Sequence, residues 1–177
     1  YPTVVFTRRG RVFYLNPEFT NTFGWTLKEL EGKTIPYVPP GLEQETSEMI
    51  DRLFEERILL RYETKRLTKD GRILDVVMRA VVYSVSKNEP AGEIVIFRDI
   101  TRERRIARNN EAILRISTAL PEYPDFAELY FMKGLAHCRL QAYPEAEAAY
   151  TRALELDPDY AQGHQWYAEI LMALGMA

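Results

Sequence analysis

The sequence has few of the side chains that bind metals or form covalent bonds. It contains one cysteine, Cys138, and two histidines, His137 and His164. A single cysteine excludes an internal disulfide and fits a reducing compartment, so we expect a cytoplasmic protein. Two histidines 27 residues apart do not form a metal site without further ligands. We therefore expect no metal centre.

Long apolar runs and catalytic motifs are also missing. No run approaches the ~20 apolar residues of a membrane span, and the N-terminus lacks the layout of a signal peptide. There is no glycine-rich phosphate loop and no nucleophile elbow. We expect neither a membrane span nor an enzymatic activity in these residues. Because the chain begins at Tyr1, we expect a piece of a longer protein, whose own activity stays open.

Charge is unevenly distributed along the chain, although the net charge is only −3. Residues 1–101 are neutral, residues 102–110 carry +3, and residues 111–177 carry −6. A nucleic-acid site would depend on the four arginines of residues 102–110. Such a short basic run is usually a solvated helix face. Nucleic acid is therefore not the expected partner.

Residues 3–101 alternate strand and helix patterns. Asn16-Pro17 is typical of a helix start, and Asp70-Gly71 is typical of a hairpin turn. The predicted helices are 19–23, a short one from Thr26, and an amphipathic one over 42–60; the predicted strands are 4–7, 11–15, 61–67, 73–85 and 92–98. This order predicts a five-stranded antiparallel sheet with helices on one side. Both faces of strand 73–85 are apolar, so we expect a second copy or the C-terminal helices to cover the outer face.

Three motifs in this unit occur at spacings found in one family. They are Asn16-Pro17-Glu18-Phe19 through Phe23-Gly24-Trp25-Thr26 with Glu29-Leu30-Glu31-Gly32-Lys33, then Lys69-Asp70-Gly71, and last Gly92-Glu93-Ile94 ending in Arg98-Asp99-Ile100-Thr101. Residues 1–101 thus resemble a PAS domain of the sensory-box type. The resemblance implies a sensor unit that forms a homodimer. Asp75 departs from the family, which often carries Trp near this position.

PAS domains hold haem, flavin, small metabolites or nothing. The side chains of residues 1–101 indicate which of these cofactors could be bound. Haem needs an axial ligand, usually His, and the photoactive flavin type needs a Cys; residues 1–101 contain neither. Both cofactors are disfavoured, as is a carboxylate sensor of the periplasmic type, which needs an Arg/His cluster. A small-molecule pocket could be lined by Phe19, Phe23, Trp25, Met49, Leu53, Phe54, Met78 and Ile96. The alternative, which we prefer, is that these side chains fill the core and that there is no cofactor.

From residue 125 onward the pattern becomes all-helical and repeats itself. At an offset of 34, residues 111–127 match residues 145–161 at seven of seventeen positions. With Gly134, Ala146, Tyr150, Ala153 and Pro158, this period resembles the tetratricopeptide repeat. We predict one complete repeat at 127–160 within a segment 127–177 that also holds the first helix of the next. Residues 102–126 form a connecting helix that resembles half of a degenerate repeat.

The repeat resemblance implies a protein or peptide partner. The groove residues it predicts are Phe131, Leu135, Cys138 and Arg139, although Phe131 and Leu135 could instead pack against a neighbouring helix. The fold class is thus α+β, a PAS-type sheet followed by an all-α helical hairpin. We expect a signalling module in which ligand, redox or partner state is passed to the repeat segment. The alternative is a constitutive scaffold or dimerisation piece, for example of a histidine kinase or a cyclic-dinucleotide enzyme.

The junction at Asp99-Ile100-Thr101 connects the two units. In similar PAS proteins this motif starts a signalling helix, often a coiled coil. Here Ile106, Ile113 and Leu120 recur every seven residues, but Ala112, Ile116 and Ala119 coincide with packing positions of a repeat's second helix. We therefore expect a helix that is also the first layer of the helical stack. A break between residues 101 and 111 would contradict this.

Overall fold

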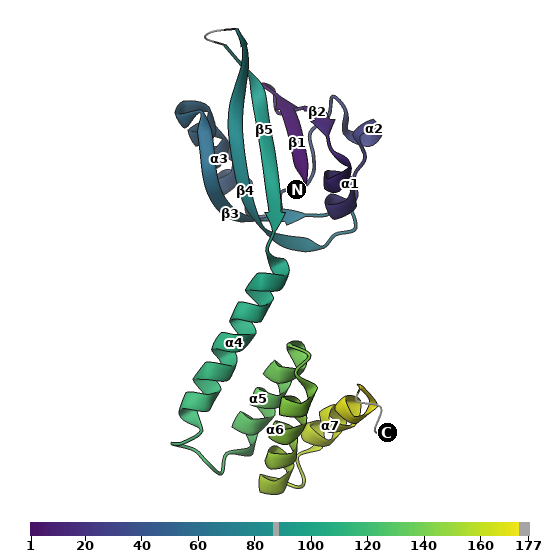
Figure 1. The fold of residues 1–177 in the computed structure, drawn as a ribbon, viewed down its shortest axis with the longest axis vertical. Helices are drawn as coiled ribbons and strands as arrows, with labels where there is room; N and C mark the ends of the chain where they lie inside the picture. Colours follow the sequence, from purple (N-terminus) through teal and green to yellow (C-terminus); the bar gives the residue numbers. More distant parts are fainter. Residues whose placement is uncertain (87–88, 174–177) are drawn as a thin grey trace. The chain divides into compact units, whose positions relative to one another are not determined.

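The computed structural model describes residues 1–86 and 89–173. The chain divides into two compact units, Tyr1–Arg102 and Glu103–Ala177, which we describe separately (Figure 1).

The N-terminal unit is a five-stranded antiparallel sheet with flanking helices, which confirms the predicted fold class. The strand order is β2-β1-β5-β4-β3, so the first and last strands in sequence meet in the middle of the sheet. Figure 1 shows β5 beside β1. The elements are β1 (Thr3–Thr7), β2 (Val12–Leu15), α1 (Pro17–Phe23), α2 (Leu27–Leu30), α3 (Glu43–Glu56), β3 (Ile58–Leu67), β4 (Ile73–Ser86) and β5 (Glu89–Asp99).

Local sequence signals set the helix ends of this unit. The side chain of Asn16 accepts a hydrogen bond from the Phe19 N–H at 2.9 Å, and Pro17 occupies the first turn of α1. Gly24 ends α1 in the left-handed region at φ 84°. The helix start at Asn16-Pro17 and the helix end at residue 23 were predicted from the sequence and are confirmed.

The core lies on one face of the sheet. It is formed by alternate residues of the strands, among them Val4, Val76 and Phe97, together with the buried side chains of α1 and α3. Phe19 and Phe23 of α1 are fully buried and stack at 4.6 Å between ring centroids. The helices therefore cover the inner face of the sheet, as expected.

One predicted boundary is wrong. The helix predicted over 42–60 ends at Glu56, and Ile58 already belongs to β3. Arg57 adopts a left-handed conformation at φ 69° and closes the last turn by donating its N–H to the Leu53 carbonyl at 2.9 Å. The apolar residues after it continue the strand alternation, so helical spacing alone misplaced them.

Strand β3 contains a bulge that changes which residues face the core. Its pairing with β4 shifts between Leu59 and Tyr62. Before the shift the odd-numbered Leu59 is buried; after it, Thr64 and Arg66 are buried and Lys65 is exposed. A bulge adds one residue to one strand and reverses the alternation beyond it. This reversal places polar side chains on the inner face.

The C-terminal unit is all helical, again as predicted. Its helices are α4 (Thr101–Ala119, which begins at the end of the N-terminal unit), α5 (Ala127–Arg139), α6 (Tyr143–Leu156) and α7 (Ala161–Ala173). α5 and α6 lie side by side as an antiparallel hairpin (Figure 1). Gly134 of α5 faces the Tyr150 ring so closely that an added Cβ would lie 2.9 Å from it. The absence of a side chain there lets the two helices approach.

Candidate functional site

The junction between the sheet and α4 is held by backbone and side-chain hydrogen bonds to one residue of β4. The Ile100 N–H donates to the Asp75 carbonyl at 2.9 Å, and the Asp75 N–H donates to Thr101 Oγ1 at 2.9 Å. The Thr101 N–H donates to Asp99 Oδ1 at 2.8 Å, in the manner of a helix cap. We call Asp75, Asp99, Ile100 and Thr101 the junction clamp. It fixes the first turn of α4 to the start of β4.

The helix that follows the clamp has no break. α4 is continuous from Thr101 to Ala119, so the interruption between residues 101 and 111 that would contradict our expectation does not occur. Within the C-terminal unit, Ile116 is buried, while Ala112 and Ala119 are half-buried. These are the positions selected by the repeat alignment. Ile106, the first residue of the predicted heptad seam, is 38% exposed in the single chain.

Most of the predicted pocket residues lie together in the core of the N-terminal unit. Phe19, Phe23, Trp25, Met49, Leu53 and Met78 are all buried in one cluster. Phe54 is half-buried, with the Arg8 guanidinium 4.7 Å from its ring centroid. Ile96 is 39% exposed because it pairs with Arg79 on the outer face of the sheet, so its assignment to the pocket is corrected.

The sequence analysis missed a group of buried polar side chains on the inner face. Arg66 of β3 is 0% exposed, Glu93 of β5 is 7% exposed, and Tyr37, in the loop before α3, is 9% exposed. Burial raises the pKa of the Tyr37 hydroxyl; Arg66 lowers that pKa and Glu93 raises it further. Both charged residues therefore act on the same hydroxyl. The available sequence signal was the alternation of Tyr62, Thr64 and Arg66 on one side of the predicted strand 61–67.

Glu93 makes the stability of the unit depend on pH. Burial raises the pKa of its carboxyl from 4.5 to about 7. The folded protein therefore keeps a proton that the unfolded chain releases above about pH 4.5, so the free energy of unfolding falls by roughly 3 kcal/mol as pH rises to about 7. We expect Glu93→Gln to remove this fall. Urea titrations of both proteins at about pH 5 and about pH 8 measure it. Parallel changes in the two proteins would contradict the assignment.

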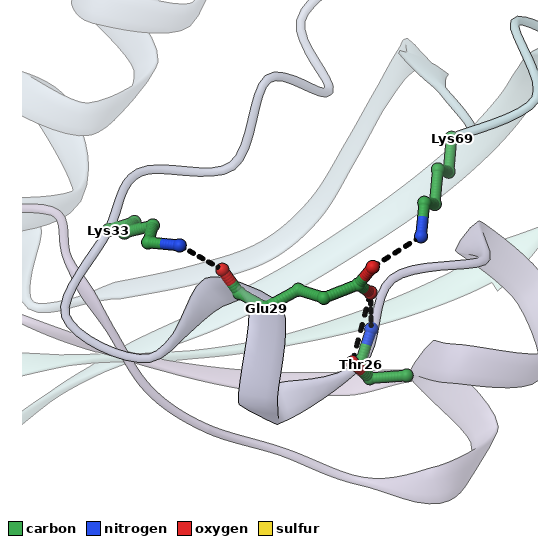
Figure 2. A network of polar contacts seen from close by, with 4 residues as sticks. All are labelled: Thr26, Glu29, Lys33 and Lys69. Carbon is green, nitrogen blue, oxygen red and sulfur yellow. Dashed lines mark hydrogen bonds and ion pairs between the residues drawn. The ribbon is translucent and has the colours of Figure 1, made fainter.

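A second polar network ties α2 to the turn between β3 and β4 (Figure 2). Glu29 accepts hydrogen bonds from the N–H and the hydroxyl of Thr26, both at 2.9 Å, and forms an ion pair with Lys69 at 2.5 Å. Lys33 donates to the Glu29 backbone carbonyl at 2.8 Å. Lys69, followed by Thr26, lowers the pKa of the Glu29 carboxyl to about 2. Because the ion pair is exposed, its role is to position the turn, and it stabilises the fold only modestly.

The predicted groove residues of the repeat are not all on one accessible surface. Phe131 is only 8% exposed and packs against Tyr150 and Tyr160, with centroids 5.3 and 5.0 Å apart. Phe131 is therefore a core residue and not a groove residue. Leu135 and Cys138 are half-buried, and Arg139 is exposed.

An open cleft of about 460 Å³ lies elsewhere in the C-terminal unit. Ile113 and Ser117 of α4 form one side. The other lining residues, from α5 and α6, are Tyr130, Lys133, His137, Glu145, Ala148, Ala149 and Arg152. Burial and Lys133 lower the pKa of the His137 imidazole. This cleft was not predicted from the sequence, because it is lined by residues of three different helices.

Two further observations bear on the class of site. Across residues 1–86 and 89–173, no group of three or more His, Cys, Asp or Glu side chains is placed to hold a metal ion. None of the helices described in these ranges is long and apolar enough to cross a membrane.

Comparisons with known families agree with both units. Residues 2–100 match the family described as PAS fold, and residues 127–160 match the tetratricopeptide repeat. The order predicted from the sequence, a sensory-box unit followed by a repeat, is thereby confirmed.

Relatives and solved structures are similar to part of the chain. The virulence sensor protein BvgS of Bordetella bronchiseptica is 33% identical over 112 residues, or 60% of this chain and 9% of the relative; BvgS of Bordetella pertussis is 32% identical over 112 residues. The chain thus spans less than a tenth of the length of these relatives.

Among solved structures, the PAS domain of a Colwellia psychrerythraea protein is 25% identical with a TM-score of 0.52, covering 57% of this chain and 86% of that chain. The dark structure of the blue-light photoreceptor Aureochrome1 LOV has 11% identity and a TM-score of 0.51 over 58% of this chain and 78% of that chain. The second likeness shows the fold alone.

Proposed function

Because the chain belongs to the PAS fold family, we propose that it is a signalling module in which the state of the PAS unit biases α4 and, through it, the repeat segment. The junction clamp is the observation that carries this proposal. It joins β4 to the first turn of α4 by hydrogen bonds of 2.9 Å to both backbone groups of Asp75. A change in the inner face of the sheet can therefore reach the helix through the backbone of one strand.

The sensory part of the proposal has independent support from the relatives. BvgS is named a virulence sensor, and its similarity to this chain extends over 112 residues. The repeat segment would provide the output, because tetratricopeptide hairpins expose helical surfaces that bind proteins or peptides. The matched repeat is a single hairpin of α5 and α6 followed by α7. We propose that this segment contacts a protein partner.

The partners and cellular setting follow from the same proposal. The outer face of the sheet carries partly exposed apolar side chains, including Val81 at 42% and Ile96 at 39%, which a second copy of the chain would cover. We propose a cytoplasmic homodimer that performs no chemistry in these residues. A longer parent protein would then contain any enzymatic output.

Hydrogen exchange tests the signalling proposal directly. Ligand, redox state or a partner is expected to change the exchange of residues 99–120, because the clamp sits at the start of α4. If exchange in this segment is the same under every condition, the module does not signal through α4. The constitutive scaffold would then be the better explanation.

Thr101→Val should weaken the clamp without changing the shape of the side chain. The valine leaves the Asp75 N–H without its acceptor, so exchange in the first turn of α4 should rise roughly tenfold. The change that a stimulus causes in residues 99–120 should also be lost. Thr118→Val is the matched control, because among the described residues the Thr118 hydroxyl bonds only to the Leu114 carbonyl of its own helix, at 2.9 Å. Equal effects of the two substitutions would refute the role of the clamp.

A further inference from the structure

Arg66 is the most unusual side chain in the PAS unit. It lies on β3, after the bulge, and is 0% exposed although it carries a charged guanidinium. Fully buried arginines are rare unless an anion pairs with them. The contacts of Arg66 therefore indicate which kind of anion could bind beside it.

Hydrogen bonds of good geometry reach only one end of the guanidinium, although the Tyr37 hydroxyl is near enough to Arg66 for Arg66 to lower its pKa. Nη1 donates to Thr64 Oγ1 at 3.2 Å and to the Lys65 carbonyl at 2.8 Å. The guanidinium carbon lies 5.2 Å from the centroid of the Tyr37 ring. In the described part of the chain, Nε and Nη2 have no hydrogen-bond partner. These two atoms form one edge of the guanidinium, whose parallel N–H groups match the two oxygens of a carboxylate.

The protein supplies only indirect compensation for this charge. Glu45 of α3 accepts hydrogen bonds from the Thr64 hydroxyl at 3.0 Å and from the Tyr62 hydroxyl at 2.9 Å. The Thr64 hydroxyl thus donates a hydrogen bond to Glu45 and accepts one from Nη1 of Arg66. No carboxylate among the described residues forms an ion pair with Arg66 itself. The free edge is therefore available to an anion from outside the chain.

The surroundings of the free edge restrict the chemistry of that anion. Tyr37, which lies against the guanidinium, also contacts Phe6, Phe23 and Phe97, with centroids 6.4, 6.5 and 6.0 Å apart. The other buried ionisable group that acts on Tyr37 is Glu93, which is a carboxyl group and so supplies no cation. A second negative charge on the ligand would have no cation to meet it. One carboxylate on an apolar body satisfies both conditions.

We propose that the Nε and Nη2 edge of Arg66 binds the carboxylate of a small monocarboxylic acid with an apolar body. This inference rests on the proposed function, for which the bound acid would be the input. It differs from our preference for a core that is filled by side chains and holds no ligand. That preference was based on the apolar residues alone. It also needs no histidine, in contrast to the Arg/His cluster considered in the sequence analysis.

NMR of the wild-type chain observes the proposed bond itself. The Nε–Hε signal of Arg66, assigned through its contact with the Tyr37 ring, is followed while benzoate or butyrate is added. We expect this signal to move downfield and to saturate. Benzamide and butyramide have nearly the same shape without the charge, and inorganic phosphate has charge without the apolar body; neither kind of probe should cause the shift. An unmoved Arg66 signal with both acids overturns the proposal.

Two variants test whether benzoate binding needs the two parallel N–H groups of Arg66 or only its positive charge. Arg66→Lys keeps the charge but lacks the two parallel N–H groups, so benzoate should bind roughly ten- to a hundredfold more weakly. Arg79→Lys is the matched control, since Arg79 is exposed on the outer face of the neighbouring strand, and it should bind as the wild type does. Equal affinity in all three proteins overturns the proposal. If Arg66→Lys does not fold, the wild-type titration decides alone.

The outcome can be separated from that of the signalling proposal. If benzoate shifts the Arg66 signal but hydrogen exchange in residues 99–120 does not respond, the binding site stands and signalling through α4 fails. If exchange there responds to another stimulus and the Arg66 signal never moves, signalling stands and the carboxylate site fails. Pairing of Arg66 with the chain's own Glu93 in solution, seen as an Arg66 shift removed by Glu93→Gln, would also overturn the proposal.

Discussion

Gly92→Ala is expected to destabilise the PAS unit by about 3 kcal/mol or more, a large part of the stability of such a domain. A Cβ at Gly92 would lie 1.9 Å from the Phe6 carbonyl oxygen and 2.8 Å from the Tyr83 ring. The oxygen belongs to the backbone of β1, so it cannot rotate away. β1 lies between β2 and β5, and its displacement would disturb the pairing on both sides. Urea unfolding of the wild type and the variant measures the loss.

Gly10→Ala is the matched control for this prediction. Gly10 has φ 67°, and an added Cβ would meet nothing within 4 Å among the described residues. The substitution should cost only the strain of a left-handed alanine, about 1 kcal/mol. If Gly92→Ala is no more harmful than Gly10→Ala, the backbones of β1 and β5 do not approach as closely at Gly92 as this prediction requires.

Tyr150→Ala is expected to cost the repeat unit about 3–5 kcal/mol and to unfold α5, α6 and α7 together. Tyr150 is 0% exposed and fills the space between Gly134 and Phe131. One hairpin with few neighbours has little stability to lose, because repeats are stabilised by stacking on one another. Hydrogen exchange resolved by residue should show lost protection in these helices, while the sheet of the PAS unit keeps its protection.

Tyr150→Phe separates the packing of the ring from its hydroxyl. In the part of the chain that the structure describes, the buried hydroxyl makes no hydrogen bond of good geometry, and burial followed by the neighbouring Cys138 thiol raises its pKa. Removing an unpaired buried hydroxyl should change the free energy of unfolding by about 1 kcal/mol or less, in either direction. A loss as large as that of Tyr150→Ala would show that the hydroxyl is bonded in solution.

The two units thus depend on different kinds of close packing. In the PAS unit the absence of a side chain at Gly92 allows two backbones to pair. In the repeat, the absence of one at Gly134 allows a helix to rest on the Tyr150 ring. α4 connects the two units without a break. The clamp at Asp75 and Thr101 is therefore the place where substitutions should affect signalling more than stability.

Local chemistry in the sequence was enough to predict much of this protein. The cap at Asn16, the stop at Gly24, and the 34-residue offset each depend on residues close together in the chain. These signals predicted the order of the elements and the two families. Of the three positions of α4 that the repeat alignment selected, Ile116 is buried and Ala112 and Ala119 are half-buried, whereas the buried Asn109 was not selected.

The sequence could not decide which face of a strand is buried when both alternations are plausible. In β5, Ile96 and its neighbours Val95 and Phe97 are all apolar, and only pairing with β1 and β4 shows that Ile96 points outward. In α5, Phe131 suited a groove as well as a core, and the rings of Tyr150 and Tyr160 decided for the core. Each choice depended on a neighbour far away in the sequence.

The sequence by itself determined a sensory-box sheet followed by a helical repeat, whereas only the tertiary structure decided what the core contains. The bulge between Leu59 and Tyr62 shifts β3 by one residue and turns Arg66 inward in place of Lys65. A shift of one residue exchanges the two faces of a strand, yet it leaves the local sequence pattern almost unchanged. The buried charge that we propose as a binding group is therefore set by strand pairing and not by any motif.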